Sequence, residues 1–261
     1  MKNQEDPMHF RFYKKVRSVL FRTSRFMQAK KVLVGVSGGI DSSVLLHELA
    51  CFVAREGGPC LVAVHVHHGI RGEDADLDFL EAQNQAQKHA VPFIVKYLAM
   101  GEQKSEEALR QARMQVLEEV ALQEGADLIL LAQHMQDQAE TFLLRLFRGA
   151  GVQGLAGMKM LRNERWFRPF LQIQKQEIEQ EAQHRNLSYR IDKSNFDTSY
   201  RRNAVRHNIL PKLQTMFNPN IIHNLADLCS SFEQLDDYIN TVVDPFIPEP
   251  EDQTSTLLRL Q

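Results

Sequence analysis

Residues 31–43 read KVLVGVSGGIDSS, and this stretch decides the fold. The apolar run at residues 32–36 is rich in β-branched side chains, which predicts a buried strand. The small residues Ser-Gly-Gly follow at 37–39, and an apolar helical pattern then continues to about residue 54. A strand, a small-residue turn and a helix N-terminus together form an anion site. The free N–H groups of the first helical turn point at the ligand, and the helix dipole favours negative charge.

The turn differs from two widespread phosphate loops. No Lys follows a second Gly at the Walker A spacing, and the dinucleotide pattern G-x-G-x-x-G is absent. Asp41 puts a carboxylate beside the expected phosphates, which is favourable if a divalent cation lies between them. Asp41, Ser42 and Ser43 would also suit a plain helix cap, but a cap does not require Ser-Gly-Gly before it. We therefore predict a phosphate site in which Asp41 acts through a bound divalent cation.

The same six residues, SGGIDS at 37–42, resemble the S-G-G-x-D-S loop of the ATP pyrophosphatase superfamily, the PP-loop enzymes. The resemblance implies that ATP is cleaved between its α and β phosphates, that AMP is transferred to an oxygen of the substrate, and that a nucleophile then displaces the AMP. It implies ATP contacts from Ser37, Gly38, Gly39, Ile40, Asp41 and Ser42. The loop alone leaves GMP, NAD and asparagine synthetases and tRNA thiolases open.

Further apolar runs predict strands at residues 61–67, 92–98 and 128–132, each separated from the next by a helical pattern. This alternation predicts an α/β fold with a doubly wound, mostly parallel sheet. With the PP-loop resemblance we expect a Rossmann-like sheet of five strands. The catalytic domain is expected at residues 1–215. A helical extension with a Pro-rich tail is expected at 216–261, without the usual C-terminal tRNA-binding domains of the family.

Composition limits the other possibilities. The 261 residues are 43% hydrophobic and 25% charged, which predicts a packed globular chain. The net charge is −2, so any nucleic-acid surface must be local. Three cysteines without a C-x-x-C pair argue against a disulfide framework or a structural zinc site. The N-terminus lacks a signal-peptide pattern and no run approaches a membrane span, so we expect a cytoplasmic protein without a membrane partner.

Titratable side chains gather directly after the strand at 128–132. Residues 134–141 read HMQDQAET, and on a helix His134, Asp137 and Thr141 share one face, with Glu140 about one turn beyond Asp137. An acidic helix cap would explain Asp137 but not the density of the group. Because ligands bind at the carboxyl ends of strands in such sheets, we predict a functional cluster there.

The order of motifs favours one branch of the superfamily. H-x-x-D-Q-x-E-T at 134–141, R-x-x-R-G-A-G at 145–151, R-P-F at 168–170, D-x-S-N-x-D at 192–197 and R-N-x-V-R at 202–206 resemble the tRNA(Ile)-lysidine synthetase family. The resemblance implies ligation of L-lysine to C2 of the wobble cytidine of CAU-anticodon tRNA(Ile). ATP and Mg²⁺ would be used, an adenylated cytidine would form, and lysidine, AMP and pyrophosphate would result. Family members often pair, so a homodimer is expected.

The resemblance also suggests roles for single residues. The implied catalytic set is Asp41, Arg113, His134, Asp137, Glu140 and Arg206. In it Asp137 and Glu140 would bind lysine, Arg113 and Arg206 would stabilise the transferring phosphate, and His134 would either position phosphate or relay a proton. Further nucleotide contacts are expected from His67, His68 and Arg71. The expected tRNA contacts are Arg145, Arg148, Arg168, Arg202 and Arg206.

Two stretches of one charge sign support an RNA substrate. Between residues 145 and 168 six basic residues accompany one acid, and bases again dominate from 185 to 212. Such segments suit contacts to an RNA backbone. Three alternatives remain: a tRNA cytidine thiolase, which would need reactive cysteines or iron–sulfur ligands; another PP-loop synthetase with a small-molecule substrate; and a non-catalytic nucleotide- or RNA-binding protein.

Overall fold

A computed structural model describes residues 7–67, 73–98, 106–191 and 197–243. Its helices are α1 (Pro7–Arg22), α2 (Ser24–Gln28), α3 (Ile40–Glu56), α4 (Glu73–Lys88), α5 (Glu106–Glu124), α6 (Met135–Leu146), α7 (Val152–Leu155), α8 (Lys175–His184), α9 (Arg201–Ala204), the π-helical segment η2 (Val205–Ile209), α10 (Leu210–Met216) and α11 (Ile221–Val243). Its strands are β1 (Lys31–Gly35), β2 (Cys60–His67), β3 (Phe93–Tyr97), β4 (Leu128–Leu130), β5 (Leu161–Arg162) and β6 (Trp166–Phe167).

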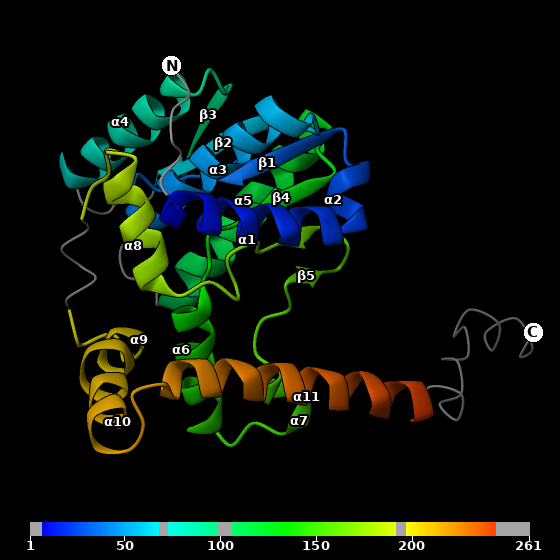
Figure 1. The fold of residues 1–261 in the computed structure, drawn as a ribbon, viewed down its shortest axis with the longest axis vertical. Helices are drawn as coiled ribbons and strands as arrows, with labels where there is room; N and C mark the ends of the chain where they lie inside the picture. Colours follow the sequence, from blue (N-terminus) through cyan, green and yellow to red (C-terminus); the bar gives the residue numbers. More distant parts are fainter. Residues whose placement is uncertain (1–6, 68–72, 99–105, 192–196, 244–261) are drawn as a thin grey trace, which may run out of the picture.

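The strands form one sheet in the order β3-β2-β1-β4-β6-β5 (Figure 1). The first four strands in the chain are mutually parallel, and β6 continues the parallel pairing beside β4 through Ile129↔Trp166. The strand order reverses direction at β1, so β1 and β4 lie at the switch point where α/β sheets bind ligands. The predicted doubly wound, mostly parallel fold is confirmed.

The expected number of strands was wrong: the sheet has six strands rather than five. The additional strand, β5, pairs antiparallel with β6 at the edge of the sheet through Leu161↔Phe167 and Arg162↔Trp166. Each of these two strands is only two residues long, which is too short to carry a hydrophobic period.

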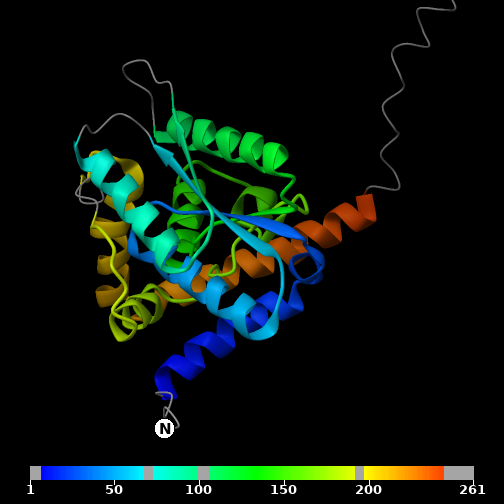
Figure 2. The same cartoon turned by 90° about the horizontal axis from the view of Figure 1, so that it is seen from above.

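Helices cover both faces of the sheet (Figure 2). One face packs against α1, α2, α3, α4 and α8, and Val32 and Val34 of β1 point into this core. The opposite face packs against α5, where Leu33 of β1 meets Leu117 and Val120. Because side chains alternate along a strand, β1 contributes to both cores and is buried on both sides.

The chain after residue 134 builds a third apolar cluster below the sheet. Helix α6 runs from the sheet into this cluster, where Phe142 and Leu143 pack with Leu225 and Cys229 of α11 (Figure 1). The helical segment expected after residue 215 is present as α11. No helix in the described ranges combines the length and apolarity that a membrane span requires.

Candidate active site

The turn after β1 is held in a conformation that only glycine takes without strain. Gly38 has a φ of +81°, and a Cβ atom there would lie 2.6 Å from the backbone oxygen of Asp78. The Ser42 hydroxyl accepts a hydrogen bond from the Ser37 N–H at 3.1 Å and donates to the Gly39 carbonyl at 3.0 Å. Helix α3 then begins at Ile40, with Gly39 as its N-cap. The predicted strand, glycine turn and helix N-terminus are all present.

Two segments distant in sequence hold this turn in place. The Arg190 N–H donates to the Gly38 carbonyl at 2.9 Å, and Gln85 of α4 donates to the same carbonyl at 3.3 Å. Gln85 also donates to the Ser188 carbonyl, which accepts a further hydrogen bond from the Ser43 hydroxyl. The turn is therefore fixed from α4 and from the loop after α8. We did not predict these supporting contacts, which join residues far apart in sequence and follow no motif.

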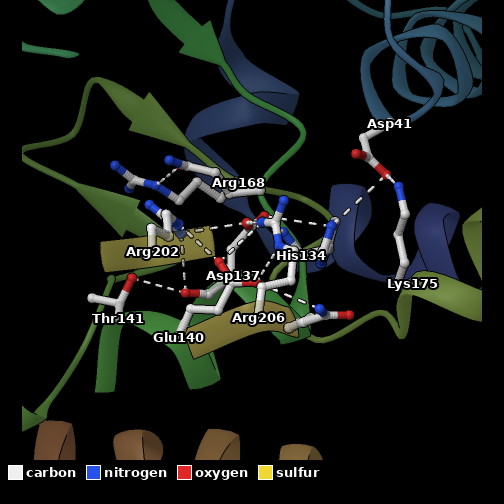
Figure 3. A network of polar contacts seen from close by, with 11 residues as sticks. Asp41, His134, Asp137, Glu140, Thr141, Arg168, Lys175, Arg202 and Arg206 are labelled. Atoms are coloured by element: carbon white, nitrogen blue, oxygen red, sulfur yellow. Dashed lines mark hydrogen bonds and ion pairs between the residues drawn. The ribbon is translucent and has the colours of Figure 1, made fainter. Parts of the chain in front are cut away.

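Asp41, in the first turn of α3, faces two positively charged or protonatable groups (Figure 3). Lys175 donates from Nζ to Asp41 Oδ1 at 2.6 Å, and His134 Nε2 lies 3.8 Å from the same oxygen. Lys175 is the first residue of α8 and no motif that we used marks it. Asp41 is about one-third exposed, so its carboxylate remains accessible from solvent.

His134 joins the glycine turn to the predicted acidic cluster. It is the N-cap of α6, and its backbone N–H donates to Asp137 Oδ2 at 3.0 Å. Its ring Nε2 lies 3.5 Å from that carboxylate and 3.8 Å from Asp41. The ring is buried, and its Nδ1 has no hydrogen-bond partner among the described residues. The side chains that follow β1 and β4 therefore lie close together.

Two arginines neutralise the acids of this cluster. Glu140 is fully buried, and its oxygens accept hydrogen bonds from Arg202 Nε at 2.8 Å and from Arg206 Nη2 at 2.9 Å. Asp137 Oδ1 accepts from both guanidinium groups, at 3.3 and 3.2 Å. Arg202 and Arg206 are four residues apart, on α9 and η2, so both reach α6 from one face (Figure 3).

The charges in this cluster control its protonation. Burial alone would raise the pKa of Asp137, but the charges of His134, Arg202 and Arg206 lower that pKa to about 2. Burial lowers the pKa values of Arg202 and Arg206, yet Asp137 and Glu140 outweigh burial and raise both. Asp137 is therefore a carboxylate, and both arginines are cations, at neutral pH.

Arg113 of α5 lies beside this cluster. Burial lowers its pKa, and the charges of Arg110 and Arg202 lower it further. Arg110 pairs with Glu107, whereas the guanidinium of Arg113 makes no hydrogen bond or ion pair to any residue within the described ranges. A guanidinium without an acidic partner, close to other cations, is suited to bind an anion.

The nucleotide contacts expected from His67, His68 and Arg71 stay predictions. His68 and Arg71 lie outside the described residues. His67 is buried at the end of β2, where its Nε2 lies 3.1 Å from Asp76 Oδ1 and its ring packs on Tyr97. The imidazole already has protein partners, so a direct contact from His67 to a nucleotide stays a prediction.

Among the five arginines expected to contact tRNA, Arg148, after α6, has an exposed side chain that makes no hydrogen bond or ion pair to the described residues. Arg168 is only 4% exposed, and its guanidinium donates to Gln133 and to the Lys159 carbonyl. The guanidinium already has protein partners, so a direct RNA contact from Arg168 stays a prediction. Arg145 donates to the carbonyls of Gly154 and Gly157, which orders the glycine-rich turn. Arg202 and Arg206 are held by the acids of α6.

Comparison with known proteins shows the family of this chain. A family model described as a PP-loop domain matches residues 9–213. The chain is 34% identical over 213 residues to a tRNA(Ile)-lysidine synthase of Clostridium tetani, an alignment that covers 79% of this chain and 45% of that protein. It is 39% identical over 220 residues to the tRNA(Ile)-lysidine synthase of Geobacter sulfurreducens, covering 82% and 46%. The chain spans about half the length of these curated relatives.

Among solved structures, the chain resembles a U34-tRNA thiolase from Methanococcus maripaludis that carries a [4Fe-4S] cluster. The TM-score is 0.71 at 19% identity, covering 88% of this chain and 80% of the other. It also resembles an NMN synthetase from Francisella tularensis, with a TM-score of 0.53 at 13% identity, covering 85% and 95%. These two likenesses concern the fold alone. The glycine turn after β1, the switch point beside β4 and the family match over residues 9–213 together establish that this chain belongs to the PP-loop family.

Proposed function

We propose that the chain ligates L-lysine to C2 of the wobble cytidine of CAU-anticodon tRNA(Ile), at the expense of ATP. The support comes from relatives named tRNA(Ile)-lysidine synthase and from the site itself. One observation carries the proposal. His134 lies within 3.8 Å of Asp41 and within 3.5 Å of Asp137, so the glycine turn and the acid–arginine cluster belong to one site.

The glycine turn suits the phosphates of ATP. A side chain at Gly38 would meet backbone at 2.6 Å, so the turn leaves no room for one. The N-terminus of α3, the Ser37 and Ser42 hydroxyls and the Lys175 ammonium supply hydrogen-bond donors for phosphate oxygens. Asp41 provides one carboxylate, which suits Mg²⁺ because this ion takes one or two carboxylates together with substrate phosphates. When bound, Mg²⁺ would neutralise charge on the phosphates.

Two displacement steps follow from this reaction. In the first, the C2 oxygen of cytidine forms a bond to the α-phosphorus while the bond from that phosphorus to the bridging oxygen breaks and pyrophosphate leaves. In the second, the neutral ε-amine of lysine forms a bond to C2, loses a proton, and AMP departs with the former C2 oxygen. Negative charge develops on the phosphates in the first step, so cations beside them lower the barrier. Arg113 is the candidate without an acidic partner within the described residues.

The substrate lysine is expected to bind at Asp137 and Glu140. Its binding would require these carboxylates to change partners. Both carboxylates already accept hydrogen bonds from Arg202 and Arg206, and Glu140 is fully buried. A lysine ammonium would have to replace one of these guanidinium groups. RNA phosphates would be suitable new partners for the released arginine. We therefore expect RNA to strengthen lysine binding.

The cysteines of this chain argue against the thiolase alternative. Burial raises the pKa of Cys229 to about 12 and also raises the pKa of Cys51, so both thiols stay protonated and poorly nucleophilic. Cys60 begins β2, at the opposite end of the strand from the candidate site. In the described residues no cluster of three or more His, Cys, Asp or Glu suits a metal ion.

The proposed function is tested by incubating the protein with ATP, ¹⁴C-lysine and an unmodified CAU-anticodon tRNA(Ile) transcript. The expected result is radiolabel fixed in the RNA together with AMP, both dependent on ATP. The matched control is the same transcript with uridine at the wobble position, which is expected to take up no label. Sulfur transfer, or AMP formation driven by a small acceptor without RNA, would replace this proposal with one of its alternatives.

A further inference from the structure

The side chain of Lys175 occupies the position next to the Asp41 carboxylate. Its Nζ lies 2.6 Å from Oδ1, although 134 residues separate the two in sequence (Figure 3). Lys175 extends from the N-terminus of α8, and α8 packs against α3, the helix that carries Asp41. The packing of α8 against α3 therefore places Lys175 beside the phosphate turn.

The ion pair between Lys175 and Asp41 is better suited to an exchange of partners than to stabilising the fold. The Lys175 and Asp41 side chains are 26% and 32% exposed, and ion pairs in such surroundings contribute little to stability. Lysine carries its charge on a flexible stem with three rotatable donors, so its ammonium can change partners without moving the helix. The turn that leads to Asp41 carries the hydroxyls of Ser37 and Ser42 and the N-terminus of α3, all donors suited to phosphate oxygens.

The Asp41 carboxylate pairs with one cation in this structure and would be needed by another when ATP binds. In this structure it pairs with Lys175, and the charge of Arg206 also acts on it. When ATP and Mg²⁺ bind, the carboxylate is needed near the metal, and the lysine ammonium is left without its partner. A phosphate oxygen in the same turn is then the nearest anion that the stem can reach.

We propose that Lys175 is a nucleotide-contacting residue, which releases Asp41 when ATP binds and transfers its ammonium to a phosphate oxygen. The proposal rests on ATP binding at the glycine turn, as in the proposed function, but needs neither RNA nor lysine. No covalent bond to Lys175 forms or breaks in this exchange. By holding Asp41 beforehand, it also makes Mg²⁺ binding dependent on the nucleotide.

The test measures nucleotide binding rather than turnover. Calorimetric titrations of the Lys175→Met variant with α,β-methylene ATP and Mg²⁺ are expected to show affinity reduced about ten- to hundredfold, as for loss of one charge-assisted hydrogen bond. Adenosine, which has no phosphates, is expected to bind as to the unchanged protein. Lys175→Arg keeps the charge and is expected to restore most of the affinity.

Lys15→Met is the matched control. Lys15 forms an ion pair with Glu177, in the first turn of the same helix α8, but from the side of α1. This variant removes a lysine that contacts the same turn of α8 but lies on α1, and it is expected to bind α,β-methylene ATP unchanged. Thermal unfolding of each variant checks that it is folded.

A second measurement tests the exchange itself. In EDTA, Asp41→Asn frees Lys175 from its partner, so this substitution is expected to tighten ATP binding. The gain should be about three- to tenfold larger when Lys175 is present than in the Lys175→Met background.

Two results would overturn the proposal. If Lys175→Met binds α,β-methylene ATP as tightly as the unchanged protein, Lys175 is only a partner of Asp41, and the proposed function survives. If the unchanged protein binds no ATP at all, both proposals fail together.

Discussion

At the scale of single residues, the site depends on a buried group of four charges. Glu140 is fully buried and accepts hydrogen bonds from two guanidinium groups, with Asp137 completing the cluster. Removing one partner from a buried ion cluster leaves the opposite charges without compensation. We expect Glu140→Gln to lower the free energy of unfolding by about 3–5 kcal/mol, measured by urea denaturation at pH 7.

The control is Glu56→Gln, which removes the carboxylate that pairs with Arg17 at 2.7 Å on the protein surface. Water and salt screen that pair, so its loss is expected to leave the unfolding midpoint nearly unchanged. Equal destabilisation by the two substitutions would mean that the α6 acids do not act as a buried cluster.

Gly38 offers a second test at this scale. Gly38→Ala combines a positive φ of +81° with a backbone contact of 2.6 Å, so the turn must move. ATP affinity should fall at least about tenfold, because a strained residue of this kind costs roughly 1–3 kcal/mol. Gly125→Ala has a similar φ of +62° but meets nothing within 4 Å, and it lies away from the site. It should lose stability and keep ATP affinity, measured by calorimetry. Equal losses of affinity in the two variants would show that the effect of Gly38→Ala is not specific to the glycine turn.

Sequence reasoning found the residues that share a motif and missed those that meet only in space. Asp41, His134 and Asp137 follow directly after predicted strands, so their convergence could be predicted from parallel strand ends. The pairing of Lys175 with Asp41 could not, because it depends on how α8 packs against α3. The burial of Arg168 could not be predicted for the same reason, because it depends on how the chain around this basic stretch packs.

At the scale of elements, the contact between α3 and α8 contains a buried acid. Glu48 of α3 is fully buried, and neither of its carboxyl oxygens has a hydrogen-bond partner among the described residues. Burial, followed by the charge of Glu181, raises the pKa of Glu48 to about 8, although Arg185 and Arg55 oppose the shift. Glu48 is therefore protonated in the folded protein at neutral pH.

This raised pKa predicts how stability changes with pH. In the unfolded chain Glu48 loses its proton near the ordinary glutamate pKa of 4.5, whereas the folded protein keeps it up to about pH 8. The contribution of Glu48 is complete below pH 4.5 and decreases as pH rises to about 8. The decrease is at most about 1.4 kcal/mol per pH unit. Glu48→Gln does not titrate, so its stability relative to the unchanged protein should rise between about pH 5 and pH 8.

The measurement is urea denaturation at half-unit pH steps. Glu119→Gln, on the exposed face of α5, is the control and should follow the unchanged protein at every pH. A constant difference between Glu48→Gln and the unchanged protein across this pH range would show that Glu48 is already ionised in the fold.

Long elements were predictable, whereas short and distorted ones were not. Strands β1 to β4 and helix α11 carry clear hydrophobic patterns, and each appears where the pattern placed it. The two-residue strands β5 and β6 carry no period, and β5 accounts for the sixth strand. The π-helical segment η2, which carries Arg206, has no sequence signature that we recognised, although such segments often occur at functional sites.

At the scale of the whole molecule, the site lies where two separately packed regions of the chain meet. The sheet and its covering helices form the first two apolar clusters, and the helices from α6 onward form the third. Helix α6 belongs to both, because its N-terminus carries the site and its later residues enter the third cluster. Arg202 and Arg206 reach the site from this helical body, so its packing sets the geometry of the acid cluster.

The same arrangement predicts where RNA binds. Because the net charge is only −2, attraction to RNA must come from local groups of bases. The side chains of Arg148, after α6, and Arg162, on β5, are exposed and make no hydrogen bond or ion pair to the described residues. Each phosphate neutralised by such a side chain adds about 0.7–0.9 to the slope of log affinity against log salt. We expect the double variant Arg148→Gln/Arg162→Gln to lower that slope by about 1.5 for a tRNA(Ile) transcript.

The matched control neutralises two exposed arginines of α1, Arg11 and Arg22. This helix covers the sheet on the side of α3 and α8 and is not part of the glycine-rich segment that follows α6. Filter binding between about 50 and 300 mM KCl measures both slopes. The α1 variant is expected to keep the slope of the unchanged protein, since total charge changes equally in the two variants and only position differs. If both variants lower the slope equally, RNA responds to overall charge, and the segment after α6 is not a specific contact surface.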